Sequence, residues 1–234
     1  MSNEHFGIVI SVYNEKGGSG KTTTSCQLAG TLGRRGYEVL VADLDPQQTS
    51  SSWIARHSGE FFPASCWSGF RYGERVATEL ANLSKKYDII VADCAPSVEQ
   101  PATWGALLSS SLALIPTKLN ATDMDALPAA KRLAKKAWDT LEGDRFPIRV
   151  VPNAAKLHFK DDRAALNTLL KDTEIPPTRT ALGDRKAYSR SMLIGSTVHN
   201  LSKSEDSVRE VEELADEVLK IVGLPAHKKG RARK

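Results

Sequence analysis

The sequence predicts an α/β protein with a doubly wound, mostly parallel sheet and helices on both faces of that sheet. Two observations predict this fold. Short apolar runs alternate along the chain with longer stretches of helical periodicity. The runs are apolar at nearly every position, which is typical of strands covered by helices on both sides, whereas a sheet with one wet face alternates apolar and polar residues.

Five apolar runs are predicted strands, and they lie at residues 6–12, 39–42, 89–92, 112–115 and 148–151. Pro116 and Pro152 are expected to end the last two strands, because proline has no N–H to donate to a strand ladder. The second strand follows a glycine, Gly36, that is expected to stop the helix before it.

Three stretches are predicted helices, at residues 22–35, 123–141 and 204–222. Asp123 is the expected N-cap of the second helix, because its carboxylate can accept a hydrogen bond from a free backbone N–H of the first turn. The third helix has an apolar stripe at helical spacing, which predicts a face packed on the core. That stripe is made of Val208, Val211, Leu214, Ala215, Val218, Leu219 and Val222.

Length and composition favour one soluble domain, which we expect to span residues 1–225. The chain has 234 residues, of which 41% are hydrophobic, and this is enough for a sizeable core. No apolar run approaches the ~20 residues of a membrane span, and the N-terminus lacks a signal-peptide pattern. We therefore expect a cytoplasmic protein that does not bind membranes. The cysteines form no Cys-x-x-Cys pair, which favours buried thiols over a zinc site or disulfides.

Residues 226–234 are predicted to form a basic, disordered C-terminal tail. The formal net charge of the chain is only +4, yet the last eight residues carry five Lys or Arg side chains and no acid. Such a tail is either a solvated chain end or an electrostatic arm for nucleic acid or anionic lipid.

A glycine-rich segment joins the first predicted strand to the first predicted helix, and it reads Lys16-Gly17-Gly18-Ser19-Gly20-Lys21-Thr22-Thr23. Its glycines allow backbone N–H groups to turn around phosphate oxygens, and the following helix directs its positive end at the same phosphates. Lys21 would place a positive charge beside the β- and γ-phosphates, and the Thr22 hydroxyl would bind Mg²⁺. The segment therefore predicts binding of ATP and Mg²⁺, although Glu15 stands where the strict phosphate-loop pattern has glycine.

Acidic side chains follow the next two predicted strands. Asp45 lies just after the second strand, in residues 43–47, and Asp93 directly follows the third. Ligands of open α/β sheets bind at the carboxyl ends of strands, so both carboxylates should face the glycine-rich loop. We predict that Thr22, Asp45 and Asp93 form the Mg²⁺ site, with Asp93 acting through the groups that bind the ion and not on the ion itself. Asp45 is also predicted to orient the attacking water or to accept its proton.

These segments together resemble the deviant Walker A ATPases of the ParA/MinD group. Residues 16–23 resemble the Walker A box of that group, residues 43–48 its switch I segment, and residues 87–97 its Walker B and switch II region. The resemblance spans residues 8–222. It is strongest to the short plasmid-partition ATPases that lack an N-terminal helix-turn-helix domain, because residues 178–191 are similar to their C-terminal block.

The resemblance implies a slow ATPase whose two subunits sandwich two ATP molecules. Lys16 of one subunit would reach the phosphates bound by the other, so Lys16, Lys21 and Asp45 form the expected catalytic set. The ATP-bound homodimer would bind DNA without sequence preference, which predicts a nucleoid-associated protein. A centromere-binding adaptor, ParB-like or of the ribbon-helix-helix type, would stimulate hydrolysis and drive the positioning of a plasmid or chromosome.

Two further expectations concern residues outside the loop. Asn153 follows the fifth predicted strand, where related proteins contact adenine, although an ordinary loop asparagine is an equal alternative. Arg185, Lys186 and Arg190 are the predicted DNA contacts, with a dimer interface or a local ion pair as the alternative for the two arginines. On a helix, Lys186 and Arg190 would share one face.

Four other functions are alternatives for a sequence with such a phosphate loop. A MinD-like membrane-cycling regulator of cell division would need an amphipathic C-terminal helix with large apolar residues, whereas the tail is basic. A reductase similar to nitrogenase iron protein would need paired cysteines, and Cys94 alone does not supply them. A small-molecule kinase or ligase is disfavoured by Lys16 and by residues 46–47. A positioning ATPase for another cargo, such as a carboxysome, would use the same residues and stays open.

Overall fold

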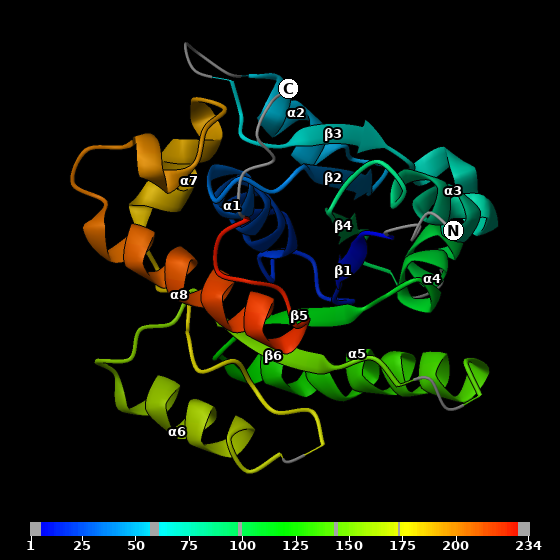
Figure 1. Cartoon of the computed structure of the whole chain (residues 1–234). Helices are drawn as coiled ribbons and strands as arrows, with labels where there is room; N and C mark the ends of the chain where they lie inside the picture. Colours follow the sequence, from blue (N-terminus) through cyan, green and yellow to red (C-terminus); the bar gives the residue numbers. More distant parts are fainter. Residues whose placement is uncertain (1–5, 57–60, 98–99, 143–144, 173, 229–234) are drawn as a thin grey trace.

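The computed structural model describes residues 6–56, 61–97, 100–142, 145–172 and 174–228. Six strands form one sheet in the order β3-β2-β4-β1-β5-β6, and every neighbouring pair is parallel (Figure 1). The predicted doubly wound α/β fold is confirmed. The strands are β1 (Ile8–Val12), β2 (Val39–Leu44), β3 (Ser65–Ser68), β4 (Ile89–Cys94), β5 (Leu112–Lys118) and β6 (Ile148–Asn153).

Helices cover both faces of the sheet. One apolar core lies between the sheet and α1 (Lys21–Arg34), α7 (Lys186–Leu193) and α8 (Glu205–Ile221). The other lies between the sheet and α3 (Val76–Leu83), α4 (Pro101–Leu108) and α5 (Ala121–Thr140). The remaining helices are α2 (Thr49–Ala55), η1 (Phe70–Arg75), α6 (Lys160–Leu169) and η2 (Val198–Asn200).

The prediction that prolines end β5 and β6 is wrong, because both strands continue past them. The Pro116 carbonyl accepts a hydrogen bond from Asn14 at 2.8 Å, on the side of β5 where pairing with β1 has already ended at Leu114. The Pro152 carbonyl accepts from the backbone N–H of Leu182, on the side of β6 that faces away from β5. In a strand the N–H and C=O of one residue point to the same side, so neither proline removes a bond from the β5–β6 ladder.

Two other local expectations differ from the structure. Asn120, and not Asp123, caps α5, and its side chain accepts from the backbone N–H of Asp123, which lies in the first turn. The edge strand β3 was not predicted, because its four residues, Ser-Cys-Trp-Ser, form no apolar run and are only partly buried. In contrast, the predicted core stripe of α8 is confirmed, since Val211, Leu214 and Val218 are buried.

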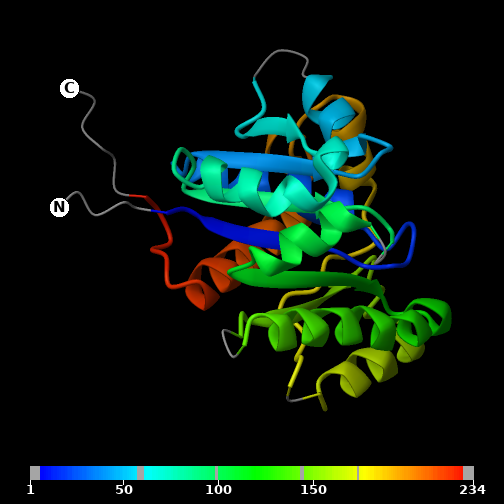
Figure 2. The same cartoon turned by 90° about the vertical axis from the view of Figure 1, so that its right-hand side faces the viewer.

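The described end of the chain docks on the amino edge of the sheet. The backbone N–H of Lys228 donates to the Arg35 carbonyl at 3.2 Å, and its side chain pairs with Asp88. The Tyr37 hydroxyl donates to the Pro225 carbonyl. The glycine-rich loop lies at the opposite, carboxyl edge, so the described C-terminal segment ends far from that loop (Figure 2). The rest of the predicted basic tail, residues 229–234, lies outside the described residues.

None of the helices in the described ranges is both long and apolar enough to cross a membrane. The three cysteines are free thiols, and two of them, Cys26 and Cys94, are buried.

Candidate functional site

The phosphate loop links β1, near the centre of the sheet, to α1. Gly18 and Gly20 both have left-handed backbone conformations, with φ of 73° and 100°. A Cβ atom at Gly20 would lie 1.5 Å from the side-chain nitrogen of Asn153. Glycine is therefore required at position 20 for two reasons, the conformation of the loop and the close approach of β6.

Asn153, the last residue of β6, is hydrogen-bonded to the main chain of the loop. Its buried side-chain nitrogen donates to the Ser19 carbonyl at 2.8 Å, and its side-chain oxygen accepts from the backbone N–H of Ala154. The structure thus brings Asn153 to the nucleotide loop with both polar groups of its amide engaged by the backbone. Its contact with adenine stays a prediction.

Lys21 is the first residue of α1, and only 6% of it is exposed. Its Nζ donates to the main-chain carbonyl of Lys16 at 3.1 Å, which folds the amine back over the loop. Burial lowers the pKa of this amine, and the nearby carboxylates of Asp93 and Asp45 act in the opposite direction. A desolvated ammonium group beside free helix N–H groups is well suited to an anionic ligand such as a phosphate.

Lys16 differs from Lys21 in the burial of its side chain. Its main chain is fixed at both ends, because its N–H donates to Asn14 at 3.0 Å and its carbonyl accepts from Lys21. Its side chain is only partly buried. The loop therefore combines one buried lysine with one that has access to the surface.

Asp93, in β4, is a buried carboxylate that accepts hydrogen bonds from three side-chain hydroxyl groups. It is 1% exposed and accepts hydrogen bonds from Thr22 at 2.9 Å and from Ser25 at 3.1 Å, both on α1, and from Ser50 on α2. Burial raises its pKa to about 6, while the hydroxyl donors favour the charged form. Sequence reasoning found Thr22 and Asp93 but missed Ser25 and Ser50. The spacing of Ser25, one helical turn after Thr22, was the available signal for the first of them.

The segment after β2 is organised by Asp43. This buried carboxylate accepts from the backbone N–H of Ser51 at 2.8 Å, from the Ser51 hydroxyl at 2.7 Å and from the N–H of Asp45 at 3.2 Å. Asp45 itself is partly exposed and accepts from the N–H of Gln47 at 2.9 Å. Asp43 therefore shapes the turn, and Asp45 is displayed at the carboxyl edge of the sheet beside the phosphate loop.

The side chains at this edge fit a magnesium ion bound together with a nucleotide. Thr22, Asp93 and Asp45 offer hydroxyl and carboxylate oxygens, which are the ligands that Mg²⁺ prefers. Within the described ranges no group of three His, Cys, Asp or Glu side chains could hold a metal ion alone. The presence of Asp93 and Asp45 beside the phosphate loop suits Mg²⁺, which is usually bound through one or two carboxylates plus substrate phosphates.

The predicted DNA contacts separate into two groups. Arg185 precedes α7 and donates to Glu210 at 2.7 Å and to Asp206 at 3.0 Å, so it ties α7 to α8. Lys186 and Arg190 are exposed on α7, four residues apart. The structure thus presents these two cations on one helix, while the expected alternative of a local ion pair applies to Arg185.

Comparison with known proteins gives one family. The model of the CobQ/CobB/MinD/ParA nucleotide binding domain matches residues 10–225. The Maintenance of carboxysome distribution protein A of Halothiobacillus neapolitanus is 26% identical over 221 residues, which cover 93% of this chain and 98% of that protein. The probable plasmid-partitioning protein ParA of Thermus thermophilus is 24% identical in an alignment that covers 95% of this chain and 81% of that protein.

A solved structure agrees in fold. The putative plasmid partition protein of Borrelia burgdorferi B31, bound to AMPPNP, superposes with a TM-score of 0.72 and 19% identity, covering 92% of this chain and 99% of that one. The family match extends over the whole phosphate loop, both acidic segments and all later strands. The chain therefore belongs to the CobQ/CobB/MinD/ParA family of nucleotide-binding domains.

Proposed function

We propose that this protein is a Mg²⁺-dependent ATPase that partitions DNA. Its ATP-bound form is a sandwich homodimer that binds DNA without sequence preference, and a centromere-binding adaptor stimulates hydrolysis. The observation that carries this proposal is the different burial of the two lysines of the loop. Lys21 is buried beside Asp93 and is available to its own nucleotide, whereas Lys16 has a fixed main chain and a side chain with access to the surface.

The chain's own groups have distinct tasks in this mechanism. The loop N–H groups and Lys21 bind and orient the phosphates. Thr22 and Asp93 would hold the Mg²⁺ ion that accompanies the nucleotide. Asp45 orients the attacking water at the carboxyl edge. When bound, Mg²⁺ neutralises charge on the phosphate oxygens. Lys16 of the partner subunit adds a second cation, which makes the association of two subunits depend on ATP.

Positioning of another cargo is the second candidate, because a relative that matches nearly the whole chain is named for carboxysome distribution. The two functions share the ATPase cycle and differ in the adaptor. A pull-down with the ATP-bound protein followed by mass spectrometry separates them. A DNA-binding adaptor supports partition, whereas a shell-associated adaptor supports cargo positioning.

The first prediction concerns Lys21. Lys21→Ala should lower ATP affinity by at least ~100-fold, because the phosphates lose several charge-assisted contacts worth ~1.5–3 kcal/mol each. Isothermal calorimetry with Mg²⁺ and ATP measures the effect, and Lys203→Ala, an exposed lysine before α8, is the matched control. Near-normal affinity in a folded Lys21→Ala protein would remove this residue from the site.

The second prediction concerns hydrolysis. Asp45→Ala should bind ATP but turn it over ~10²–10⁴-fold more slowly, because the water loses its orienting group. The variant should then accumulate as an ATP-bound dimer in size-exclusion chromatography. Asp139→Ala, at an exposed position of α5, is the control and should behave as wild type. Unchanged turnover of Asp45→Ala would contradict the assignment.

The third prediction concerns the dimer. Lys16→Ala should keep its affinity for nucleotide as a monomer yet fail to dimerise with ATP, because the second cation across the interface is missing. Analytical ultracentrifugation with ATP and with ADP tests this. A Lys16→Ala protein that dimerises normally with ATP would show that the sandwich arrangement does not apply to this chain.

The fourth prediction concerns DNA. The ATP form should bind unrelated duplexes equally, and its affinity should fall with salt at a log–log slope near −0.9 per phosphate contact. Lys186→Ala with Arg190→Ala should reduce that slope while ATPase activity survives, and removal of residues 229–234 should reduce it further. Arg185→Ala is tested separately, because this side chain pairs with Glu210 and Asp206.

The control for this experiment is Lys160→Ala with Arg163→Ala, which removes two exposed cations from α6. Fluorescence polarisation with ATP and with ADP across a salt series gives both slope and nucleotide dependence. Equal binding in the two nucleotide states, or no binding at low salt, would refute nucleotide-gated DNA binding.

A further inference from the structure

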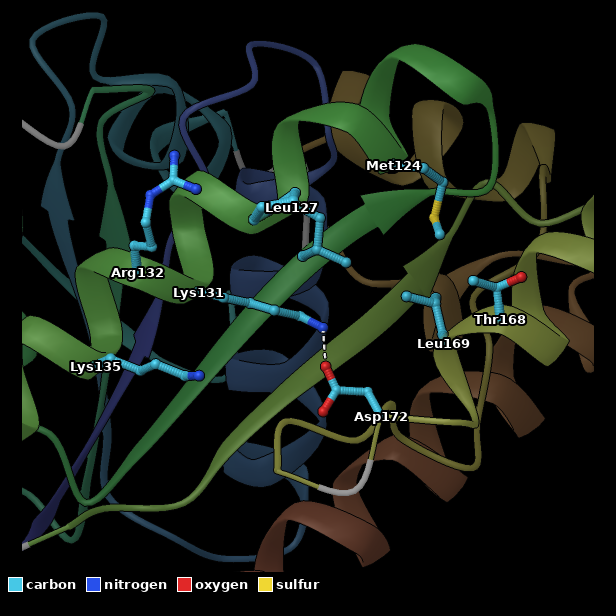
Figure 3. Close-up of a pocket in the computed structure, with 9 residues that line it drawn as sticks. Met124, Leu127, Lys131, Arg132, Lys135, Thr168, Leu169 and Asp172 are labelled. Carbon is cyan, nitrogen blue, oxygen red and sulfur yellow. Dashed lines mark hydrogen bonds and ion pairs between the residues drawn. The ribbon is translucent and has the colours of Figure 1, made fainter.

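A groove of about 410 Å³ lies between α5 and α6, on the side of the molecule beyond β5 and β6 (Figure 3). It is lined by Met124, Leu127, Pro128, Lys131, Arg132, Lys135, Thr168, Leu169 and Asp172. No residue of the phosphate loop or of α7 lines it. The groove is therefore a separate feature from the nucleotide site and from the proposed DNA contacts.

The floor of the groove is apolar. Met124 and Leu127 of α5 lie opposite Leu169 of α6, and Pro128 adds a further apolar surface. Of the residues in α6, Leu169 alone is buried. Leu170, which follows α6, is 58% exposed. The α5–α6 pair thus presents an apolar channel next to the exposed Leu170, a feature that is typical of a protein-binding surface.

Cations line one flank of this channel. Lys131, Arg132 and Lys135 project from α5 in Figure 3, and Asp172 is the acidic side chain among the lining residues. Lys131 pairs with Asp172, and Lys135 pairs with Glu174 at 2.6 Å, beyond the groove. Arg132 is exposed, and no ion pair joins it to another described residue. These partly exposed pairs are weak, so incoming carboxylates can replace them at little cost.

We propose that the α5–α6 groove docks an acidic amphipathic helix of a partner protein. Apolar side chains at positions i, i+3, i+4 and i+7 of such a helix would fill the channel between Met124 and Leu169. Its carboxylates would face the cationic flank, with Arg132 as the first partner. A basic helix of the same shape would be repelled by Arg132, whose charge no described carboxylate neutralises, so Arg132 gives the groove its selectivity.

The position of the groove also indicates in which nucleotide states of the protein a partner helix can bind. Since neither the loop nor α7 contributes to it, docking leaves the nucleotide site and the exposed cations of α7 accessible. The partner helix should therefore bind equally in the ADP and ATP states. This inference does not rest on the ATPase proposal, and its test can fail or succeed independently of that proposal.

The probe is a fluorescein-labelled synthetic helix with Leu at i, i+3, i+4 and i+7 and Glu at the flanking positions. Two control peptides replace every Glu by Lys, or scramble the Leu positions at constant composition. The full-length protein should bind the Glu helix at least ~10-fold more tightly than either control in polarisation titrations with ADP and with ATP. Equal binding of the Lys helix, or no binding of the Glu helix, would overturn the proposal.

Variants place the binding in the groove. Arg132→Glu should weaken binding by ~10-fold or more, and Thr168→Trp, at an exposed lining position, should block the channel. Arg163→Glu, exposed on α6 outside the lining, should leave binding unchanged. Circular dichroism establishes that each variant is folded. Wild-type binding by both groove variants would place the helix elsewhere and refute the assignment.

The methionines supply a direct readout. In protein labelled with ¹³C at the methionine methyl groups, the Glu helix should shift the signal of Met124, which lines the groove. The signal of Met192, on α7, should stay in place. A shift of Met192 without a shift of Met124 would contradict the proposed location.

Discussion

The site depends on the hydrogen bonds that the buried carboxylate of Asp93 accepts. This carboxylate accepts hydrogen bonds from hydroxyl groups of Thr22, Ser25 and Ser50, which come from the start of α1 and from α2. Taking a carboxylate out of water is costly unless such donors surround it. The same burial raises its pKa to about 6. This single group therefore fixes the phosphate loop, the segment after β2 and the centre of the sheet relative to one another.

From this centre a second polar contact extends to the C-terminal part of the chain. Gln27 is fully buried in α1, donates to the Ser191 hydroxyl of α7 at 2.8 Å and accepts from the N–H of Val198 at 3.0 Å. Glu210 of α8 holds the other side of α7 through Tyr188 and Arg185. The helix that carries Lys186 and Arg190 is thus anchored to the helix that begins at the phosphate loop. The contacts of Gln27 therefore connect the helix that follows the phosphate loop with the helix that carries the proposed DNA contacts.

The sequence predicted the fold and the phosphate loop because both have local signals. Fully apolar runs indicate strands covered on two faces, and glycines followed by Lys21 and Thr22 indicate a phosphate-binding helix start. What it missed depends on contacts between distant segments. β3 has no apolar run, and its place at the edge follows from pairing with β2. Pro152 fits within a strand because its carbonyl points away from β5 and accepts a hydrogen bond from the N–H of Leu182. No local sequence pattern reveals this contact.

For the side chains of the site, too, the local sequence indicates the residue type, whereas contacts between distant segments determine its environment. The two lysines belong to the same glycine-rich segment, and their different burial arises from the turn at Gly18 and Gly20, which the hydrogen bond from Asn153 to the Ser19 carbonyl supports. Arg185 is as basic as Arg190, yet a buried glutamate 25 residues later holds the first while the second remains exposed. Charge in the sequence therefore located a basic segment, whereas tertiary packing decided which of its cations stabilise the fold and which are available to a ligand.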